Sequence, residues 1–258
     1  MNRIEEKMTA LKNEGRKAFI TYTTAGLPDM ETTKKIMFAQ QEAGIDVMEL
    51  GIPFSDPVAD GPVIQAASYE AIQKGATLTK IFTLMKEVRK EGLTTPVVFM
   101  MYYNTVYHYG LEEFVEMCAD CGVDGLIIPD LPYEEQKEIN AVLAENEAAP
   151  ILIQLVSPVS KQRIPMIVNN ARGFVYCVSQ MGVTGNGANF HKQIREYLLE
   201  VKKNSPVPVM MGFGIRTAGD VEPLEDIIDG AIVGSHFITL MKENNYCLLY
   251  TSDAADDK

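Results

Sequence analysis

Two carboxylates in the first quarter of the chain have the residue type and the setting for acid-base chemistry. Glu49 lies at the end of the apolar run DVMEL, and Asp60 lies in the loop that follows, GIPFSDPVADGP. A carboxyl group partly shielded from water has a raised pKa, as a general acid or base requires. Asp60 directly precedes Gly61 and Pro62, which begin the next expected helix, whereas Asp56 projects further out. We therefore predict that Glu49 and Asp60 are catalytic.

Both carboxylates also have structural interpretations. Glu49 in a structural ion pair would need a basic residue at a neighbouring strand end, and Arg216 is the one that falls there. Asp56 and Asp60 are the natural pair for a metal ion, but no histidine accompanies them, so we predict no metal site. The three prolines of the loop restrict its backbone, which favours a loop held in one shape over a passive connector.

The cysteines and histidines are not assigned to the site. Cys118 and Cys121 form a CxxC, but they lie in the helical pattern LEEFVEMCADCG without a second ligand pair, and we predict two buried helix residues. The histidines, His108, His191 and His236, fall in loops or helix starts with no shared spacing. We assign them no catalytic role.

Three glycine segments late in the chain, GVTGNG, GFGI and VGSH, have the composition of an anion site. Free backbone N–H groups in such loops, and at the helix N-terminus that follows one of them, bind phosphate without Lys or Arg. This suits an acidic chain. We predict phosphate contacts from Thr184, Gly185, Gly214, Gly234 and Ser235.

Tyrosines are expected at three strand ends. Tyr22, Tyr102 and Tyr176 fall at or near the ends of the first, third and sixth apolar runs. Their rings are suited to a flat apolar substrate group while their hydroxyls stay hydrated. We predict that these side chains line a substrate pocket.

A recurring phrase shows which elements must position these residues. A helical pattern ends on glycine, and a β-branched residue and an aspartate then lead into an apolar strand, as in EAGIDVMEL, DCGVDGLIIPD and IIDGAIVGS. Eight such strands alternating with helices predict a single (β/α)8 TIM barrel, with an extra helix at residues 2–14 capping its amino-terminal end. An open doubly wound sheet is the rival, but TTAGLPD lacks the G-x-G-x-x-G turn usual after its first strand. The expected strands are AFITYT, DVMEL, VVFMM, GLIIP, ILIQLV, GFVYCV, VPVMMG and DGAIVG.

Length and charge narrow the class of protein. The 258 residues suit one barrel domain, which we place at residues 1–246. A net charge of -12 disfavours nucleic acid as a partner, because binding it requires Lys and Arg to neutralise phosphates. No apolar stretch approaches the roughly 20 residues that cross a bilayer, and four cysteines are too few for a disulfide scaffold. These features predict a cytoplasmic enzyme with no membrane partner.

The segment ELGIPFSDPVADGPVIQ resembles the signature of the tryptophan synthase alpha subunit family. The segments MYYN, GVTG, GFGI and VGS follow in the family's order, so that the resemblance covers residues 1 to about 246. It implies a lyase that cleaves indole-3-glycerol phosphate into indole and glyceraldehyde 3-phosphate by a retro-aldol reaction, in the biosynthesis of tryptophan. It also implies that this half-reaction needs neither a metal nor an organic cofactor.

The resemblance also implies residue roles and a partner. Glu49 would deliver and remove protons along the carbon chain and Asp60 would act on the indole N–H, although the sequence leaves open which carboxylate performs each proton step. The implied partner is the beta subunit, which holds pyridoxal phosphate and receives indole in an alpha2-beta2 heterotetramer. Pro53, Asp56 and Asn104 would face it.

Two other functions remain open at this stage. Another phosphate-binding barrel, an isomerase or synthase of the same pathway, would require a Lys or a Cys/Asp pair at the strand ends, and this sequence has neither there. The other is a non-catalytic or weakly active barrel that binds a phosphate ligand and activates the beta partner.

Residues 247–258, CLLYTSDAADDK, do not continue the expected amphipathic final helix. They resemble translated sequencing-adapter DNA, and we predict a non-native tail and a truncated final helix that leaves apolar barrel surface uncovered. Replacing the tail with a full-length amphipathic helix should raise the melting temperature in a thermal scan. An unchanged melting temperature would contradict this interpretation.

Overall fold

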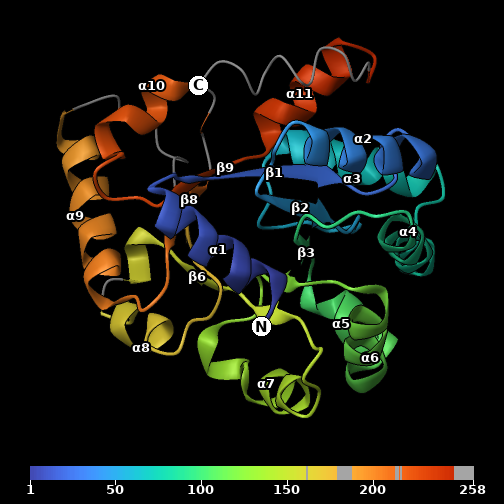
Figure 1. The fold of residues 1–258 in the computed structure, drawn as a ribbon, viewed down its shortest axis with the longest axis horizontal. Helices are drawn as coiled ribbons and strands as arrows, with labels where there is room; N and C mark the ends of the chain where they lie inside the picture. The colour runs from blue at the N-terminus through green and yellow to red at the C-terminus, as the bar shows by residue number, and fades with distance from the viewer. Residues whose placement is uncertain (161, 179–187, 213–214, 216, 247–258) are drawn as a thin grey trace.

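Parallel strands form a closed barrel with helices around it (Figure 1). The computed structural model describes residues 1–160, 162–178, 188–212, 215 and 217–246. Within these residues the strand order is β5-β4-β3-β2-β1-β9-β8-β7-β6, all parallel. The strands are β1 (Ala18–Thr24), β2 (Val47–Gly51), β3 (Val97–Met100), β4 (Gly125–Ile127), β5 (Ile151–Leu152), β6 (Gln154–Val156), β7 (Val175–Val178), β8 (Val209–Gly212) and β9 (Gly230–Val233).

The two ends of this order join because β5 and β6 are halves of one barrel strand. Only Ile153 separates them, and its N–H donates to the carbonyl of Leu126 in β4 at 2.9 Å. The run therefore pairs with β4 through its first half and with β7 through its second. The predicted eight-stranded (β/α)8 barrel is confirmed.

Helices follow the strands around the barrel, and each is too short or too polar among the described residues to cross a bilayer. Asp29 is the N-cap of α2, since its carboxylate accepts from the N–H of Thr32 at 2.7 Å. The helices are α1 (Arg3–Glu14), α2 (Met30–Glu42), α3 (Pro62–Gln73), α4 (Leu78–Lys90), α5 (Tyr103–Tyr109), α6 (Leu111–Cys121), α7 (Lys137–Ala144), α8 (Ile164–Val168), α9 (Ala188–Asn204), α10 (Ala218–Val221) and α11 (Ser235–Glu243), with 3-10 turns η1 (Tyr133–Glu135), η2 (Pro158–Ser160) and η3 (Glu222–Leu224).

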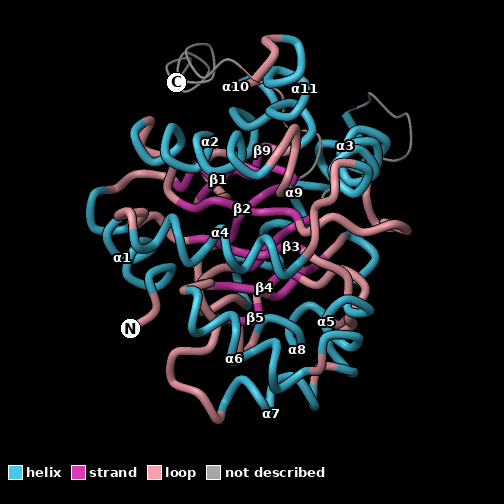
Figure 2. Tube along the Cα trace, turned by 90° about the vertical axis from the view of Figure 1, so that its right-hand side faces the viewer, coloured by secondary structure: helices cyan, strands magenta, loops and turns pink. Residues whose placement is uncertain are grey.

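The first helix closes the amino-terminal end of the barrel, as the sequence predicts. Figure 2 shows α1 at one end of the strands. Its buried residues Ile4, Met8 and Leu11 belong to the same apolar cluster as Ile20 and Val98 of the barrel strands. The loops that follow the strands lie at the opposite, carboxyl-terminal end of the barrel.

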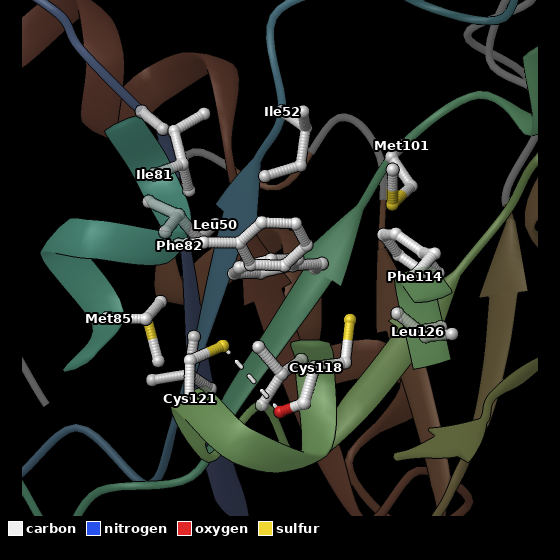
Figure 3. Packing of buried hydrophobic residues seen from close by; sticks show 14 of the residues in the cluster. Leu50, Ile52, Ile81, Phe82, Met85, Met101, Phe114, Cys118, Cys121 and Leu126 are labelled. Carbon is white, nitrogen blue, oxygen red and sulfur yellow. Dashed lines mark hydrogen bonds between the residues drawn. The ribbon is translucent and has the colours of Figure 1, made fainter. Parts of the chain in front are cut away.

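A second apolar cluster lies between the barrel and the helices outside β2, β3 and β4 (Figure 3). Phe82 of α4 and Phe114 of α6 pack with ring centroids 6.0 Å apart. Cys118 and Cys121 are buried in this cluster, and the Cys121 thiol donates to the Cys118 carbonyl at 3.6 Å. The prediction of two buried helix cysteines is confirmed.

The aspartate of the recurring sequence pattern connects neighbouring strands at three places in the barrel. Asp46, Asp124 and Asp229 stand immediately before or at the entry to β2, β4 and β9. Each carboxylate accepts a backbone N–H from the start of an adjacent strand, at distances of 2.7 to 2.9 Å: the donors are Phe19, Val97 and Val209 respectively. Each also pairs with a basic side chain. The recurring sequence pattern therefore supplies a hydrogen bond between neighbouring strands as well as the glycine that ends the helix.

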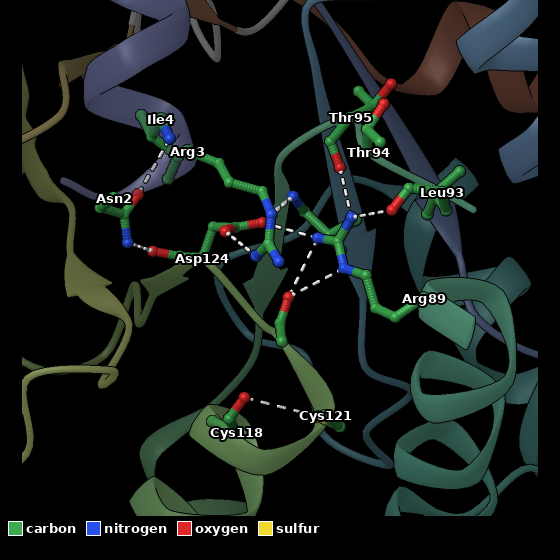
Figure 4. A network of polar contacts seen from close by, with 12 residues as sticks. Asn2, Arg3, Ile4, Arg89, Leu93, Thr94, Thr95, Cys118, Cys121 and Asp124 are labelled. Carbon is green, nitrogen blue, oxygen red and sulfur yellow. Dashed lines mark hydrogen bonds and ion pairs between the residues drawn. The ribbon is translucent and has the colours of Figure 1, made fainter. Parts of the chain in front are cut away.

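Asp124 makes the most connected of these joints (Figure 4). Its carboxylate accepts from Arg3 at 2.8 Å and from Arg89 at 2.7 Å, and its backbone carbonyl accepts from Asn2 at 2.9 Å. Arg89 also donates to the carbonyl of Gly122. The network holds the start of α1, the end of α4 and the entry to β4 together.

Asp124→Ala should lower the free energy of unfolding by about 3–5 kcal/mol, because it leaves the buried Arg89 guanidinium without its carboxylate. Asp120→Ala is the matched control. Asp120 forms an ion pair with Lys86 on the surface, with side chains 66% and 46% exposed, and its loss should cost at most about 1 kcal/mol. Urea unfolding curves measure both, and equal losses would contradict the assigned role of Asp124.

Candidate active site

Glu49 lies in β2 with its side chain enclosed at the barrel mouth. It is 1% exposed, and neither carboxyl oxygen has a hydrogen-bond partner among the described residues. Burial, with a smaller contribution from the negative charge of Asp60, raises the pKa of Glu49 to about 8. The group is therefore mainly a neutral acid at pH 7, and it is able to give up a proton.

Asp60 is held by Tyr102. The tyrosine hydroxyl donates to one carboxylate oxygen at 2.9 Å and accepts from the N–H of Ala59 at 2.9 Å. The other carboxylate oxygen is buried and has no partner among the residues that the structure describes. Burial raises the pKa of Asp60, and the hydrogen bond from Tyr102 opposes that shift. The ring of Phe54 stacks on Tyr102 with centroids 5.0 Å apart, which links the loop before Asp60 to the end of β3.

A cavity of about 170 Å³ lies at this end of the barrel. Glu49 and Gly61, the residue after Asp60, line it together with residues from several strands. Its mixed lining of apolar groups and a few polar ones is typical of a small-molecule site. The lining residues are Tyr22, Glu49, Gly61, Ile64, Met100, Tyr176, Ile215, Ile232, Gly234, Ser235 and His236.

Two glycines make room for the tyrosines of this cavity. A Cβ atom on Gly51 would lie 2.0 Å from the Tyr22 hydroxyl, and one on Gly212 would lie 2.4 Å from the Tyr176 ring. Each ring therefore occupies the space that a side chain on the adjacent strand would fill. Burial raises the pKa of both phenols, so they remain neutral.

The predicted site residues fall into three groups. The first group lines the cavity or lies next to it: Glu49, Asp60, Tyr22, Tyr102, Tyr176, Gly234 and Ser235. The second group follows β2 and β3. Pro53, half-buried, and Asp56, exposed, lie in the loop after β2, and Asn104 is exposed on α5. The third group, Thr184, Gly185 and Gly214, lies outside the described residues.

Sequence reasoning missed the apolar part of the lining. Met100 and Ile232 come from β3 and β9, Ile64 from the first turn of α3 and Ile215 from the segment after β8. Met100 lies two residues after Val98, and Ile232 lies two residues after Gly230. Period-two alternation along each strand was the available signal, since every second residue faces the barrel interior.

A larger hollow, about 1000 Å³, lies at the amino-terminal end of the barrel between α1 and α7. It contains none of the described site residues. Its buried charge, Asp124, is already paired with Arg3 and Arg89. The unpaired carboxyl groups thus select the smaller cavity as the candidate active site.

Comparisons with known proteins identify the family of the chain. Residues 8–253 match the family model described as tryptophan synthase alpha chain. The chain belongs to the tryptophan synthase alpha chain family. It is 75% identical over 257 residues to the tryptophan synthase alpha chain of Lachnospira eligens, covering 100% of this chain and 96% of that protein. The family's function is the alpha half-reaction of tryptophan synthase, the cleavage of indole-3-glycerol phosphate by a lyase.

Solved structures give the same result. The tryptophan synthase subunit alpha from Legionella pneumophila has a TM-score of 0.88 and 34% identity, covering 98% of this chain and 95% of that one. A chain of the tryptophan synthase complex from Pyrococcus furiosus has a TM-score of 0.81 and 31% identity, covering 93% and 96%. These structures therefore support both the barrel fold and the family membership of the chain.

The buried Glu49 carboxyl group should make stability depend on pH. Its pKa is about 8 in the folded chain and 4.5 when exposed, so the folded state binds more protons and stability falls as pH rises between these values. The Glu49 carboxyl group lowers the free energy of unfolding by up to about 1.4 kcal/mol for each pH unit in this range, and Glu49→Gln removes this dependence. We expect the variant to be more stable than the unaltered chain at pH 7.5 and the difference to shrink toward pH 4.5.

Urea unfolding at both pH values measures this difference, with Asp56→Asn as the exposed-carboxylate control on the same part of the chain. A difference between Glu49→Gln and the unaltered chain that does not vary with pH would contradict the assigned ionisation.

Proposed function

We propose that this chain carries out the family's cleavage with Glu49 and Asp60 as its catalytic carboxylates. The observation that supports this most directly is the Glu49 carboxyl group, which is buried, unpaired among the described residues and part of the lining of the cavity at the barrel mouth. A group in that setting has no evident structural purpose, because removing it from water opposes folding. The family's reaction needs such an acid.

The reaction transfers one proton to the indole ring and removes one from the glycerol chain. Glu49, protonated at neutral pH, delivers its proton to C3 of the indole ring. This step places a positive charge on the ring nitrogen. Its carboxylate then accepts the proton of the hydroxyl on the adjoining carbon. As the carbon–carbon bond breaks, its electron pair returns to the ring to restore indole, and the oxygen forms the aldehyde of glyceraldehyde 3-phosphate. The proton balance of Glu49 closes within one turnover.

Asp60 stabilises the charge that develops on the ring. Its carboxylate accepts from the indole N–H, and this hydrogen bond strengthens as the nitrogen becomes positive. The oxygen without a partner among the described residues is the one available for that bond, since Tyr102 holds the other. Tyr22 and Tyr176 pack against the flat ring.

The phosphate group lies at the opposite side of the cavity. Gly234 and Ser235, at the start of α11, bind it through backbone N–H groups and the hydroxyl. Thr184, Gly185 and Gly214 complete the cradle in this proposal, on the strength of the sequence alone. The chemistry written here uses carboxylates and backbone donors, so it requires neither a metal nor an organic cofactor, and it takes place in the cytoplasm.

A beta subunit binds the loops at this end of the barrel, in an alpha2-beta2 assembly, and pyridoxal phosphate belongs to that partner. Pro53, Asp56 and Asn104 face the partner. Exposed apolar side chains support the choice of surface: Val58, Tyr107 and Val159 follow β2, β3 and β6, so they all lie at the end of the barrel where the strands finish. The Pyrococcus furiosus relative was solved as a tryptophan synthase complex.

Glu49→Gln and Asp60→Asn should each lower indole release from indole-3-glycerol phosphate by about 10²–10⁴-fold, because each removes a group that handles a proton or a developing charge. The assay measures indole with and without beta subunit. Asp120→Asn, an exposed carboxylate on α6, is the control and should keep the unaltered rate. Glycerol 3-phosphate binding should persist in both site variants.

Retained indole release in both site variants would overturn the proposed mechanism. An unaltered chain that releases no indole but still stimulates the beta subunit would favour the non-catalytic activator instead.

A further inference from the structure

His236 lines the candidate active-site cavity, although no role was predicted for its side chain from the sequence. It is the second residue of α11 and directly follows Gly234 and Ser235. The same cavity contains Glu49 and Tyr22. His236 therefore comes from the element that begins at the proposed phosphate cradle.

The position of His236 is fixed by the packing of its helix. Phe237, Ile238 and Met241 are buried and belong to the same apolar cluster as Ile20 and Ile232 of the barrel strands. The hydroxyl of Thr239 donates to the Ser235 carbonyl at 2.9 Å. The first turn of α11 is thus anchored against the barrel, while the His236 side chain remains half-exposed.

The imidazole has no hydrogen bond or ion pair with any residue in the described part of the chain. The elements packed most closely on α11 are β1 and α3. Their nearby titratable groups are Tyr22, which is neutral, and Glu70, which pairs with Lys242 at 2.9 Å and Lys74 at 3.0 Å. These groups leave the imidazole available to a ligand.

The ability of His236 to carry a positive charge distinguishes it from the other described residues of the cavity lining. Among the described lining residues His236 is the one that can carry a positive charge, in a chain of net charge -12. The unpaired Glu49, 1% exposed, independently marks the cavity as a ligand site. The start of α11 supplies only the partial positive charge of its free N–H groups.

We propose that the His236 imidazole binds the phosphate end of the substrate and supplies a full positive charge beside the backbone cradle. The inference rests on the proposed function and adds a residue that determines affinity for phosphorylated ligands. A charge-assisted hydrogen bond between an imidazolium and a phosphate dianion is about twice as strong as a neutral one. His236 takes no part in the proton transfers.

The test separates the phosphate end from the indole end with two probes. Calorimetric titration of the full chain with glycerol 3-phosphate and, separately, with indole is applied to His236→Ala, His236→Gln and His236→Lys. The control is His108→Ala, an exposed histidine on α5. Thermal melting verifies that each variant is folded.

We expect His236→Ala to weaken glycerol 3-phosphate binding about tenfold and to leave indole binding within twofold. His236→Gln, which retains a donor without the charge, should lie between, and His236→Lys should restore much of the affinity. The kcat/KM of His236→Ala for indole-3-glycerol phosphate should fall by the same factor, mainly through KM.

Unchanged glycerol 3-phosphate affinity in His236→Ala and His236→Gln would overturn the inference. Equal weakening of both probes would also overturn it, because it would indicate a structural role. If the unaltered chain itself fails to bind glycerol 3-phosphate, the proposed phosphate cradle is wrong, and the role of His236 is rejected with it. Loss of indole release in Glu49→Gln is independent of all these outcomes.

Discussion

Holding the Glu49 carboxyl group inside an apolar barrel opposes folding, because no described residue replaces the hydrogen bonds that water would make with it. The chain limits the penalty by keeping the group neutral, which is the physical meaning of its raised pKa. A neutral acid on a rigid strand is also the reagent that the proposed mechanism uses. The barrel must therefore be stable enough without this residue to tolerate its position.

Among the described residues, buried acidic residues are paired at the amino-terminal end of the barrel and largely unpaired at the carboxyl-terminal end. At the amino-terminal end, Asp46 and Asp124 are as buried as Glu49, but each has a basic partner and a backbone N–H. At the carboxyl end, Glu49 has no partner among the described residues and Asp60 has one oxygen engaged. The same functional group thus stabilises one end of the fold and remains available for chemistry at the other.

The sequence predicted what depends on local pattern and missed what depends on neighbouring strands. The eight strands, the capping helix and the placement of Glu49 on the second strand follow from periodicity along one segment. The joint made by Asp124 does not, because its partner N–H belongs to Val97 on a different strand. The segment VGSH placed His236 beside two predicted phosphate contacts, but the sequence does not show that its side chain lines the cavity, which depends on the pairing of β9 with β1.

The loop after β2 connects the two proposed activities of this end of the barrel. Phe54 stacks on Tyr102, and Tyr102 binds both the N–H of Ala59 and the carboxylate of Asp60. In the proposed assembly the partner contacts this loop on its exposed side, at Asp56. In that assembly, a displacement of the Phe54 ring acts on Tyr102, and through its hydroxyl on the orientation of Asp60. Under the proposed mechanism, a shift of this hydrogen bond changes how the other Asp60 oxygen meets the indole N–H, so that Tyr102 is the contact through which partner binding would reach the ring.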